Sequence, residues 1–234
     1  MTPRVAFVIS TYPAEEQRRR EDAIMRHQRD GVELGIIRIP SRTYDGLGPD
    51  RLERLTPQFL DAFEQARAEG YDVAVPFGMY DLGADGGKSI MPVVGPCEAA
   101  LHAAAMVGRR FGMICYTPDL KPALRRLIRS YGMERWVVAF ESLGIEMNQL
   151  GPSAPAVREG LIATVSRMVQ THDVDVVIVM GVSMCPVIVP RLELEEAVGV
   201  PVVDGISAPI EMATCLFRLG LQPSRRQWPR EGAQ

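Results

Sequence analysis

The sequence is poor in residues that could hold a metal or a disulfide framework. Its four cysteines, at positions 97, 115, 185 and 215, include no Cys-x-x-Cys pair. This spacing argues against a zinc ribbon and a thioredoxin-like motif, and free thiols are the simplest state in a reducing compartment. The three histidines, His27, His102 and His172, lie far apart, and none has a second ligand four residues on. We therefore expect no metal site.

The chain also lacks a large net charge and a long apolar run. Its 26 Lys and Arg residues and 29 Asp and Glu residues leave a net charge of −3, so no basic footprint suggests nucleic acid or an anionic membrane. No segment reaches the roughly 18 apolar residues of a membrane span, and no secretory apolar stretch precedes Val5. We expect a cytoplasmic protein whose partner is a small molecule, with neither nucleic acid nor membrane as a partner.

A phosphate-binding loop is excluded by spacing. Residues 83–89 read Gly-Ala-Asp-Gly-Gly-Lys-Ser, but a P-loop needs its first glycine five positions before the second, where Leu82 stands. Lys88, one of only two lysines, could still contact an anion locally.

Regular alternation of apolar runs and helical patterns is what the sequence does contain. Hydrophobic residues make up 47% of its 234 positions, which is enough for a full core. The alternation predicts an α/β fold with mainly parallel sheets covered on both faces. We expect strands near residues 5–10, 34–39, 72–78, 110–116, 136–140, 175–181 and 200–203, and helices near 14–30, 50–69, 96–108, 119–131, 155–171, 187–198 and 207–219.

The two halves of the chain have a similar order of strands and helices. Each closes on a strand followed by a glycine-bearing loop, which hints at duplication into two similar Rossmann-like lobes around a pseudo-two-fold axis, with a ligand cleft between them. We expect one lobe from residues 1–110 with 205–220, a second from 111–204, and a loosely held tail from 221–234. The turn-rich connector at 41–49 could border the cleft.

Three segments carry a family resemblance. They are residues 73–81, residues 92–100 and residues 176–186, where apolar strands run into small-residue turns or a helix start. Together they resemble the aspartate/glutamate/hydantoin racemase superfamily. The resemblance implies a cleft for a small carboxylate or a hydantoin-like ring, and acid/base chemistry without a cofactor. It also implies two cysteines that face each other across the α-carbon of the substrate, one removing a proton and the other returning it.

Both of those cysteines are replaced in this sequence. The resemblance places Gly78 at the first position, with Pro76 and Phe77 as alternatives, and Val182 at the second. None of these side chains can move a proton. A relocated thiol is the remaining way to racemise, and Cys185 and Cys115 are the candidates.

Polar residues at the predicted strand ends make up the rest of the candidate site. Short hydroxyls can hold an anion there or cap a helix, and phenols can stack on a planar ligand or donate a hydrogen bond. Carboxylates can supply acid/base catalysis or interact with a helix dipole. The candidate catalytic residues are Tyr116, Asp81, Glu98 and Cys185, and the candidate substrate-binding residues are Ser10, Thr11, Tyr12, Gly78, Met79, Tyr80, Thr117, Val182 and Ser183.

Three functions remain open. The first is a cofactor-independent lyase, decarboxylase or hydrolase that acts without two-thiol racemisation, as in relatives where one cysteine is altered. The second is a hydantoin or amino-acid racemase that uses a relocated thiol. The third is a non-catalytic protein that keeps the ligand pocket. A homo-oligomer is expected from the resemblance alone.

Overall fold

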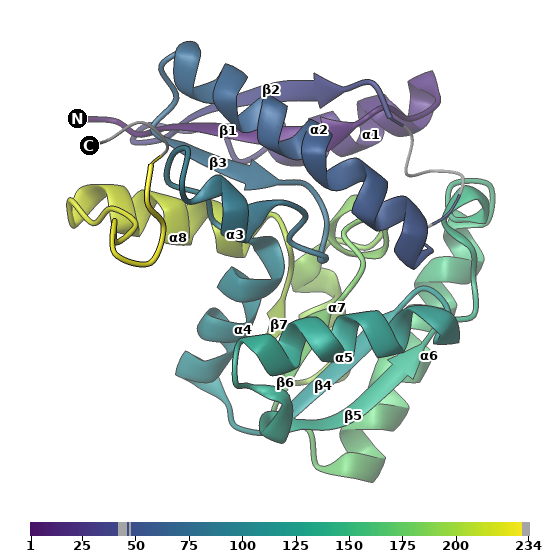
Figure 1. Cartoon of the computed structure of the whole chain (residues 1–234). Helices are drawn as coiled ribbons and strands as arrows, with labels where there is room; N and C mark the ends of the chain where they lie inside the picture. The colour runs from purple at the N-terminus through teal and green to yellow at the C-terminus, as the bar shows by residue number, and fades with distance from the viewer. Residues whose placement is uncertain (42–45, 47, 231–234) are drawn as a thin grey trace.

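The computed structural model describes residues 1–41, 46 and 48–230, and these residues form two parallel sheets (Figure 1). The first sheet has the strand order β2-β1-β3, and the second has the order β5-β4-β6-β7. The α/β class with two parallel sheets is therefore confirmed. All strands lie within two residues of the predicted ranges: β1 Arg4–Ser10, β2 Glu33–Ile39, β3 Val73–Pro76, β4 Phe111–Cys115, β5 Val137–Ser142, β6 Val176–Val179 and β7 Val202–Val203.

The helices depart from the prediction in three places. The helix expected over 14–30 ends at Met25, ahead of a turn that is closed by a bridge between Arg29 and Val32, and the short helix over Ala84–Gly87 was not expected. The helix expected over 187–198 begins only at Arg191, after Pro190, because residues 183–188 form a π-helical turn. A proline has no N–H to donate, so it fits just before a first turn and not inside the helix. The α-helices are α1 Ala14–Met25, α2 Pro49–Ala68, α3 Ala84–Gly87, α4 Pro96–Val107, α5 Lys121–Ser130, α6 Ala154–His172, α7 Arg191–Val198 and α8 Ser207–Arg218.

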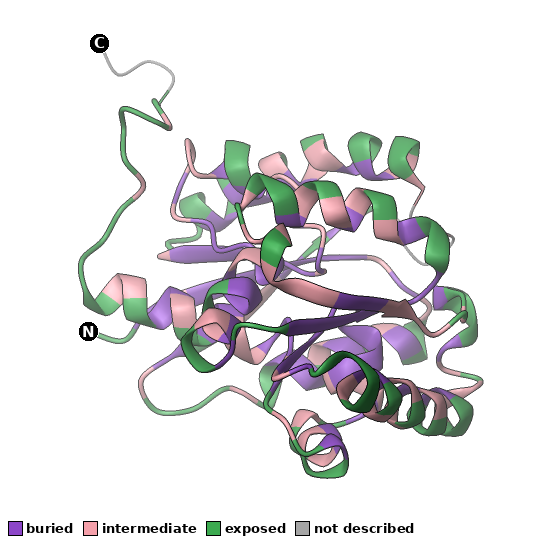
Figure 2. Cartoon of the chain, turned by 90° about the horizontal axis from the view of Figure 1, so that it is seen from below, coloured by how far each residue is buried: buried purple, intermediate pink, exposed green. Residues whose placement is uncertain are grey.

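One hydrophobic core joins the two sheets. It includes Phe7 from β1, Met113 from β4 and Val177 from β6, all fully buried. Helix α4 contacts both β6 and α8, so it links the two halves of the molecule (Figure 1). A second cluster packs Phe59 and Phe63 of α2 against the other face of the first sheet. Figure 2 shows the resulting layers, with buried strands inside and exposed faces on the outer helices.

The strand order brings four loops together at the carboxyl ends of the sheets. In the first sheet β1 lies between β2 and β3, and in the second β4 lies between β5 and β6. The connection from β1 leads to β2 on one side, while β3 lies on the other side, and in the second sheet β4 connects to β5 on one side while β6 connects to β7 on the other. Such reversals open a crevice at each switch point. These four loops are where a ligand site is expected.

The segment after α8 packs on α3 and the turn that follows it. The Trp228 indole N–H donates to Asp85 at 2.9 Å, and the Lys88 ammonium lies 5.0 Å from the centre of the Trp228 ring. Lys88 also pairs with Glu98 at 2.9 Å, so its charge is already engaged. Within the described residues no helix is long and apolar enough to cross a membrane.

Candidate active site

A small, partly open cavity lies where the four loops meet. Its volume is about 40 Å³, which is room for a few water molecules, so a ring-sized ligand needs some lining side chains to move. The connector predicted to border the cleft contributes no described lining residue, and its residues 42–45 and 47 lie outside the described part of the chain. The lining residues are Tyr12, Leu52, Phe77, Gly78, Met79, Tyr80, Leu82, Tyr116, Met147, Met180, Gly181, Val182 and Ser183.

A larger hollow of about 800 Å³ lies on the surface between α1, α4, α7 and α8. It contains none of the candidate site residues, and its lining is mostly apolar. The smaller cavity is the better candidate because it sits at the switch points of both sheets and collects polar side chains from distant parts of the chain.

The structure brings seven of the candidate residues to this cavity and leaves six outside its lining. Those that line it are Tyr12, Gly78, Met79, Tyr80, Tyr116, Val182 and Ser183. Those that do not are Ser10, Thr11, Asp81, Glu98, Thr117 and Cys185.

Two of the lining phenols are proton donors at neutral pH. Burial raises the pKa of Tyr80 and of Tyr116 above the ordinary phenol value, so both stay protonated. The Tyr80 hydroxyl is buried and has no hydrogen-bond partner among the described residues. Tyr116 fits closely against Gly181, where an added Cβ would lie 2.8 Å from the Tyr116 ring. A glycine is therefore needed there to admit the ring.

Asp81 caps α4 and does not face the cavity. Its carboxylate accepts hydrogen bonds from the Cys97 and Glu98 N–H groups at 2.7 and 2.9 Å, and from the Tyr131 hydroxyl at 2.8 Å. Burial nevertheless raises the pKa of Asp81 to about 6, against the lowering effect of these bonds. Its backbone has a φ of 50°, in the left-handed region. We assign Asp81 the structural role of a helix cap.

The other polar candidates outside the cavity are also engaged elsewhere. The Thr11 hydroxyl donates to the Ile39 carbonyl at 2.9 Å, and Glu98 pairs with Lys88. Thr117 and Ser10 are buried beside the strand ends. The Thr11 bond and the Glu98–Lys88 pair each connect two segments at the edge of the site.

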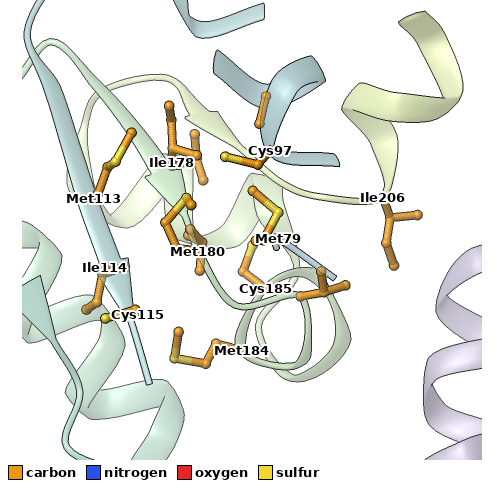
Figure 3. Packing of buried hydrophobic residues seen from close by; sticks show 14 of the residues in the cluster. Met79, Cys97, Met113, Ile114, Cys115, Ile178, Met180, Met184, Cys185 and Ile206 are labelled. Atoms are coloured by element: carbon orange, nitrogen blue, oxygen red, sulfur yellow. The ribbon is translucent and has the colours of Figure 1, made fainter. Parts of the chain in front are cut away.

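None of the thiols reaches the cavity. Cys97, Cys115 and Cys185 are fully buried in the core, where Figure 3 shows them among methionine and isoleucine side chains. Burial raises the pKa of Cys115 to about 12 and the pKa of Cys185 well above the usual thiol value. A thiol with a raised pKa is a poor nucleophile and a poor base at neutral pH. The relocated thiol proposed from the sequence thus gains no support from the geometry.

A buried ion pair behind the cavity was missed by the sequence analysis. Arg20 is fully buried and its guanidinium donates to the Glu16 carboxylate at 2.6 Å. The same guanidinium donates to the Ser183 hydroxyl at 2.8 Å and lies 4.1 Å from the centre of the Tyr12 ring. The Ser183 N–H in turn donates to the Tyr116 hydroxyl at 3.1 Å. A positive charge is therefore connected to the cavity wall.

The sequence did contain a signal for this pair. Arg20 precedes the buried residues Ala23 and Ile24 by three and four positions, which is the spacing of one helix face. Its neighbours Glu15, Glu16 and further arginines give the segment the composition of an exposed charged face, which conceals this signal. An arginine on the apolar stripe of an amphipathic helix is the clue that was available.

Comparison with known proteins gives the family. A model of the family described as Asp/Glu/Hydantoin racemase matches residues 41–213. The chain belongs to this family. The expected superfamily is thereby confirmed, and the two parallel sheets are those of its solved structures.

Relatives within the family differ in reaction. Hydantoin racemase of Rhizobium meliloti is 29% identical over 171 residues, covering 72% of this chain and 70% of that protein. The structure of allantoin racemase from Klebsiella pneumoniae aligns with a TM-score of 0.90 at 20% identity, covering 100% of this chain and 95% of that one. Unliganded arylmalonate decarboxylase aligns with a TM-score of 0.61 at 17% identity, over 92% of each chain. Membership of the racemase family therefore does not fix the reaction.

The two positions that the resemblance assigns to the family thiols both line the cavity. Gly78 follows β3 of the first sheet and Val182 follows β6 of the second, so the two reach it from different sheets. The backbone at Gly78 has a φ of 125°, and an added Cβ would meet no atom within 4 Å. Gly78 thus has no side chain at the first position, and Val182 has an apolar side chain at the second.

Proposed function

We propose that this protein is a cofactor-independent lyase that removes CO₂ from a small carboxylate. One observation carries the proposal: the described lining of the cavity contains phenols and a hydroxyl but no carboxylate, imidazole, amine or thiol. The phenols Tyr80 and Tyr116 are held protonated by burial. The site therefore has acids without a base.

This imbalance distinguishes between the reactions of the family. A racemase must first remove a proton from carbon, and a hydrolase must remove one from water, so each needs a base near the substrate. A decarboxylase starts from an ionised substrate and needs only an acid afterwards. A cavity furnished with donors suits the last of these reactions.

Backbone N–H groups supply a place for the negative charge. The loop N–H groups of Gly78, Met79, Tyr80, Gly181 and Val182 make no hydrogen bond within the described part of the chain. Donors fixed in this way stabilise an oxyanion without reorganising, and they do so more strongly in an apolar cavity than in water. Leu52, Phe77 and Met180 provide the apolar surroundings.

The proposed reaction balances with these groups alone. The bond between the α-carbon and one carboxylate breaks, CO₂ leaves, and the electron pair passes into the neighbouring carbonyl group as an enolate. The loop N–H groups hold the enolate oxygen. A phenol then gives its proton to the α-carbon and regains one from water. A substrate with a second carboxylate or carbonyl next to the α-carbon, such as an arylmalonate, meets these requirements.

A non-catalytic ligand-binding protein is the second candidate, favoured by the lack of a carboxylate, imidazole, amine or thiol in the described lining. A hydantoin-like ring could occupy the same donors without being converted. Tight binding of such a ligand with no turnover would favour this candidate. A homo-oligomer remains a prediction.

A substrate panel tests the proposal. Aryl- and alkylmalonates, maleate, aspartate, glutamate, hydantoins and allantoin are incubated with the protein, and CO₂ release and product formation are followed. We expect CO₂ from at least one malonate and none when Tyr80 and Tyr116 are both replaced by Phe. Conversion of a hydantoin or an amino acid to its mirror image without CO₂ would refute the lyase.

A further inference from the structure

We propose that Arg20 is a positioning residue, which acts through Ser183 to aim the hydroxyl proton of Tyr116 into the cavity. The inference rests on the proposed function for its catalytic consequence, but not for the hydrogen-bond order itself. Arg20 does not line the cavity itself, but it contacts the lining residues Ser183 and Tyr12 from behind.

The donor capacities of the groups fix the direction of each bond. A guanidinium can only donate, so the Ser183 oxygen must accept from Arg20 at 2.8 Å. The Ser183 hydroxyl proton is then left to point away from Arg20. The Ser183 side chain hydrogen-bonds to Tyr116, which lowers the pKa of that phenol, and the Tyr116 oxygen also accepts from the Ser183 N–H at 3.1 Å. With its oxygen accepting from Ser183, the Tyr116 hydroxyl has its own proton free for the cavity.

The buried position of Arg20 keeps this order in place. Its guanidinium donates to the Glu16 carbonyl and carboxylate at 2.8 and 2.6 Å and lies on the Tyr12 ring. Salt cannot screen a fully buried charge of this kind as it screens a surface pair. Its Nε is buried without a partner among the described residues. A charge buried at such cost is poorly explained by stability alone, because an apolar side chain of similar size often serves as well.

The arrangement also favours the state of Tyr116 that follows proton transfer. Burial raises the pKa of the phenol, whereas the bonds from Ser183 and the positive charge of Arg20 oppose that rise. The phenolate left after protonating the carbanion would thus be held by two hydrogen bonds and a nearby cation. Tyr80 has no such support, since its hydroxyl is without a partner in the described structure. Tyr116 is therefore the acid and Tyr80 a ligand contact.

The first test needs no substrate. Protein containing tyrosine labelled with ¹³C at the ring carbon that bears oxygen is prepared as wild type, Arg20→Lys and Ser183→Ala, and Tyr116→Phe assigns the resonance. Lysine keeps the positive charge, but it lacks the planar guanidinium whose N–H groups donate to Glu16 and Ser183 at the same time. We expect the Tyr116 resonance to move in both variants. Arg38→Lys is the matched control, because it alters the ion pair between Arg38 of β2 and Glu21 of α1, on the surface, and should leave the resonance unchanged.

The second test uses phenylmalonate and the CO₂ it releases. An acid that is present but misdirected should lower kcat by about 10-fold to 100-fold in Arg20→Lys and change KM by less than about 3-fold, because orientation matters in the transition state. A residue that only holds the fold would leave kcat within about 3-fold of wild type in the folded fraction.

The outcomes separate the two proposals. An unchanged Tyr116 resonance in Ser183→Ala, which leaves the Arg20–Glu16 pair intact, would overturn the positioning role even if Arg20→Lys fails to fold. Movement of the resonance without CO₂ release would support the hydrogen-bond order and count against the lyase. Movement together with a kcat loss supports both.

Discussion

Asp81 and Arg20 are both buried charged residues close to the cavity, yet their hydrogen bonds lead in different directions. Asp81 lies between the lining residues Tyr80 and Leu82, but its carboxylate turns to the start of α4 and to Tyr131. Arg20 lies one layer behind the lining and reaches it through Ser183. The hydrogen-bond partners of a charged residue therefore indicate its role better than its nearness in sequence to the lining residues does.

The largest expected effect is a difference in turnover between variants of two phenols: Tyr116, which is connected to Arg20 through Ser183, and Tyr131, which donates to Asp81. Tyr116→Phe should lower turnover by about 100-fold or more, because a positioned general acid contributes factors of that order. Tyr131→Phe removes a partly buried hydroxyl that donates only to Asp81, and should change turnover by less than about 3-fold. Steady-state rates of CO₂ release from the same malonate measure both. Equal losses in the two variants would break the distinction.

The pH dependence of stability comes next. The folded protein holds the Asp81 proton more strongly than the unfolded chain, since the pKa rises from 3.8 to about 6. Stability must then fall as pH rises through this interval, by up to about 3 kcal/mol. Asp81→Asn does not titrate and should lack this component. Urea unfolding at pH 4, 5, 6 and 7 gives the difference between the two proteins, and a flat difference would show that Asp81 titrates normally.

Replacing Asp81 by Ala should have a smaller effect at pH 7. Loss of the cap and of a favourable side chain at positive φ should cost about 1 to 2 kcal/mol in the free energy of unfolding. Asp173→Ala is the matched control, because Asp173 has a φ of 51° but an exposed side chain. Equal losses would assign the whole cost to the backbone conformation. Chemical denaturation of both variants decides between these results.

The cysteines should show the smallest effect. Cys185→Ala and Cys115→Ala each remove a buried sulfur outside the cavity, so turnover in the folded fraction should stay within about 3-fold of wild type. Mass spectrometry after iodoacetamide treatment should find label on Cys215, which is exposed, and not on the buried thiols. Loss of all activity in Cys185→Ala, with the fold retained, would revive the relocated thiol.

The strands of both sheets could be predicted from the sequence because each is marked by a local run of apolar residues. Runs such as residues 176–179 are apolar throughout and are bounded by turns, so the strands were placed within two residues. The π-helical turn at 183–188 was not expected, and its last two residues were predicted as the start of a helix. Its backbone depends on packing, to which the buried residues Met184 and Cys185 contribute. Elements fixed by local pattern were predictable, and those fixed by distant contacts were not.

The candidate site was predictable in place but not in detail. The predicted strand ends pointed to Tyr12, Tyr80 and Ser183 as candidates, and all three line one cavity. The cap made by Asp81 joins it to N–H groups 16 and 17 residues away, and the bond from Arg20 to Ser183 spans 163 residues. Such pairings follow from the packing of α1 and α4 against the loops, which no single-sequence pattern states.

Proton exchange at the α-carbon tests the central claim most directly, namely that the cavity supplies acids and no base. The wild-type protein is incubated in deuterium oxide with the full panel, and both the recovered substrate and any product are examined by mass spectrometry and polarimetry. The account predicts a product that has lost CO₂ and gained one deuterium, with recovered hydantoins and amino acids that carry none and keep their rotation. Deuterium in a recovered hydantoin or amino acid, with loss of rotation and no CO₂, would contradict it.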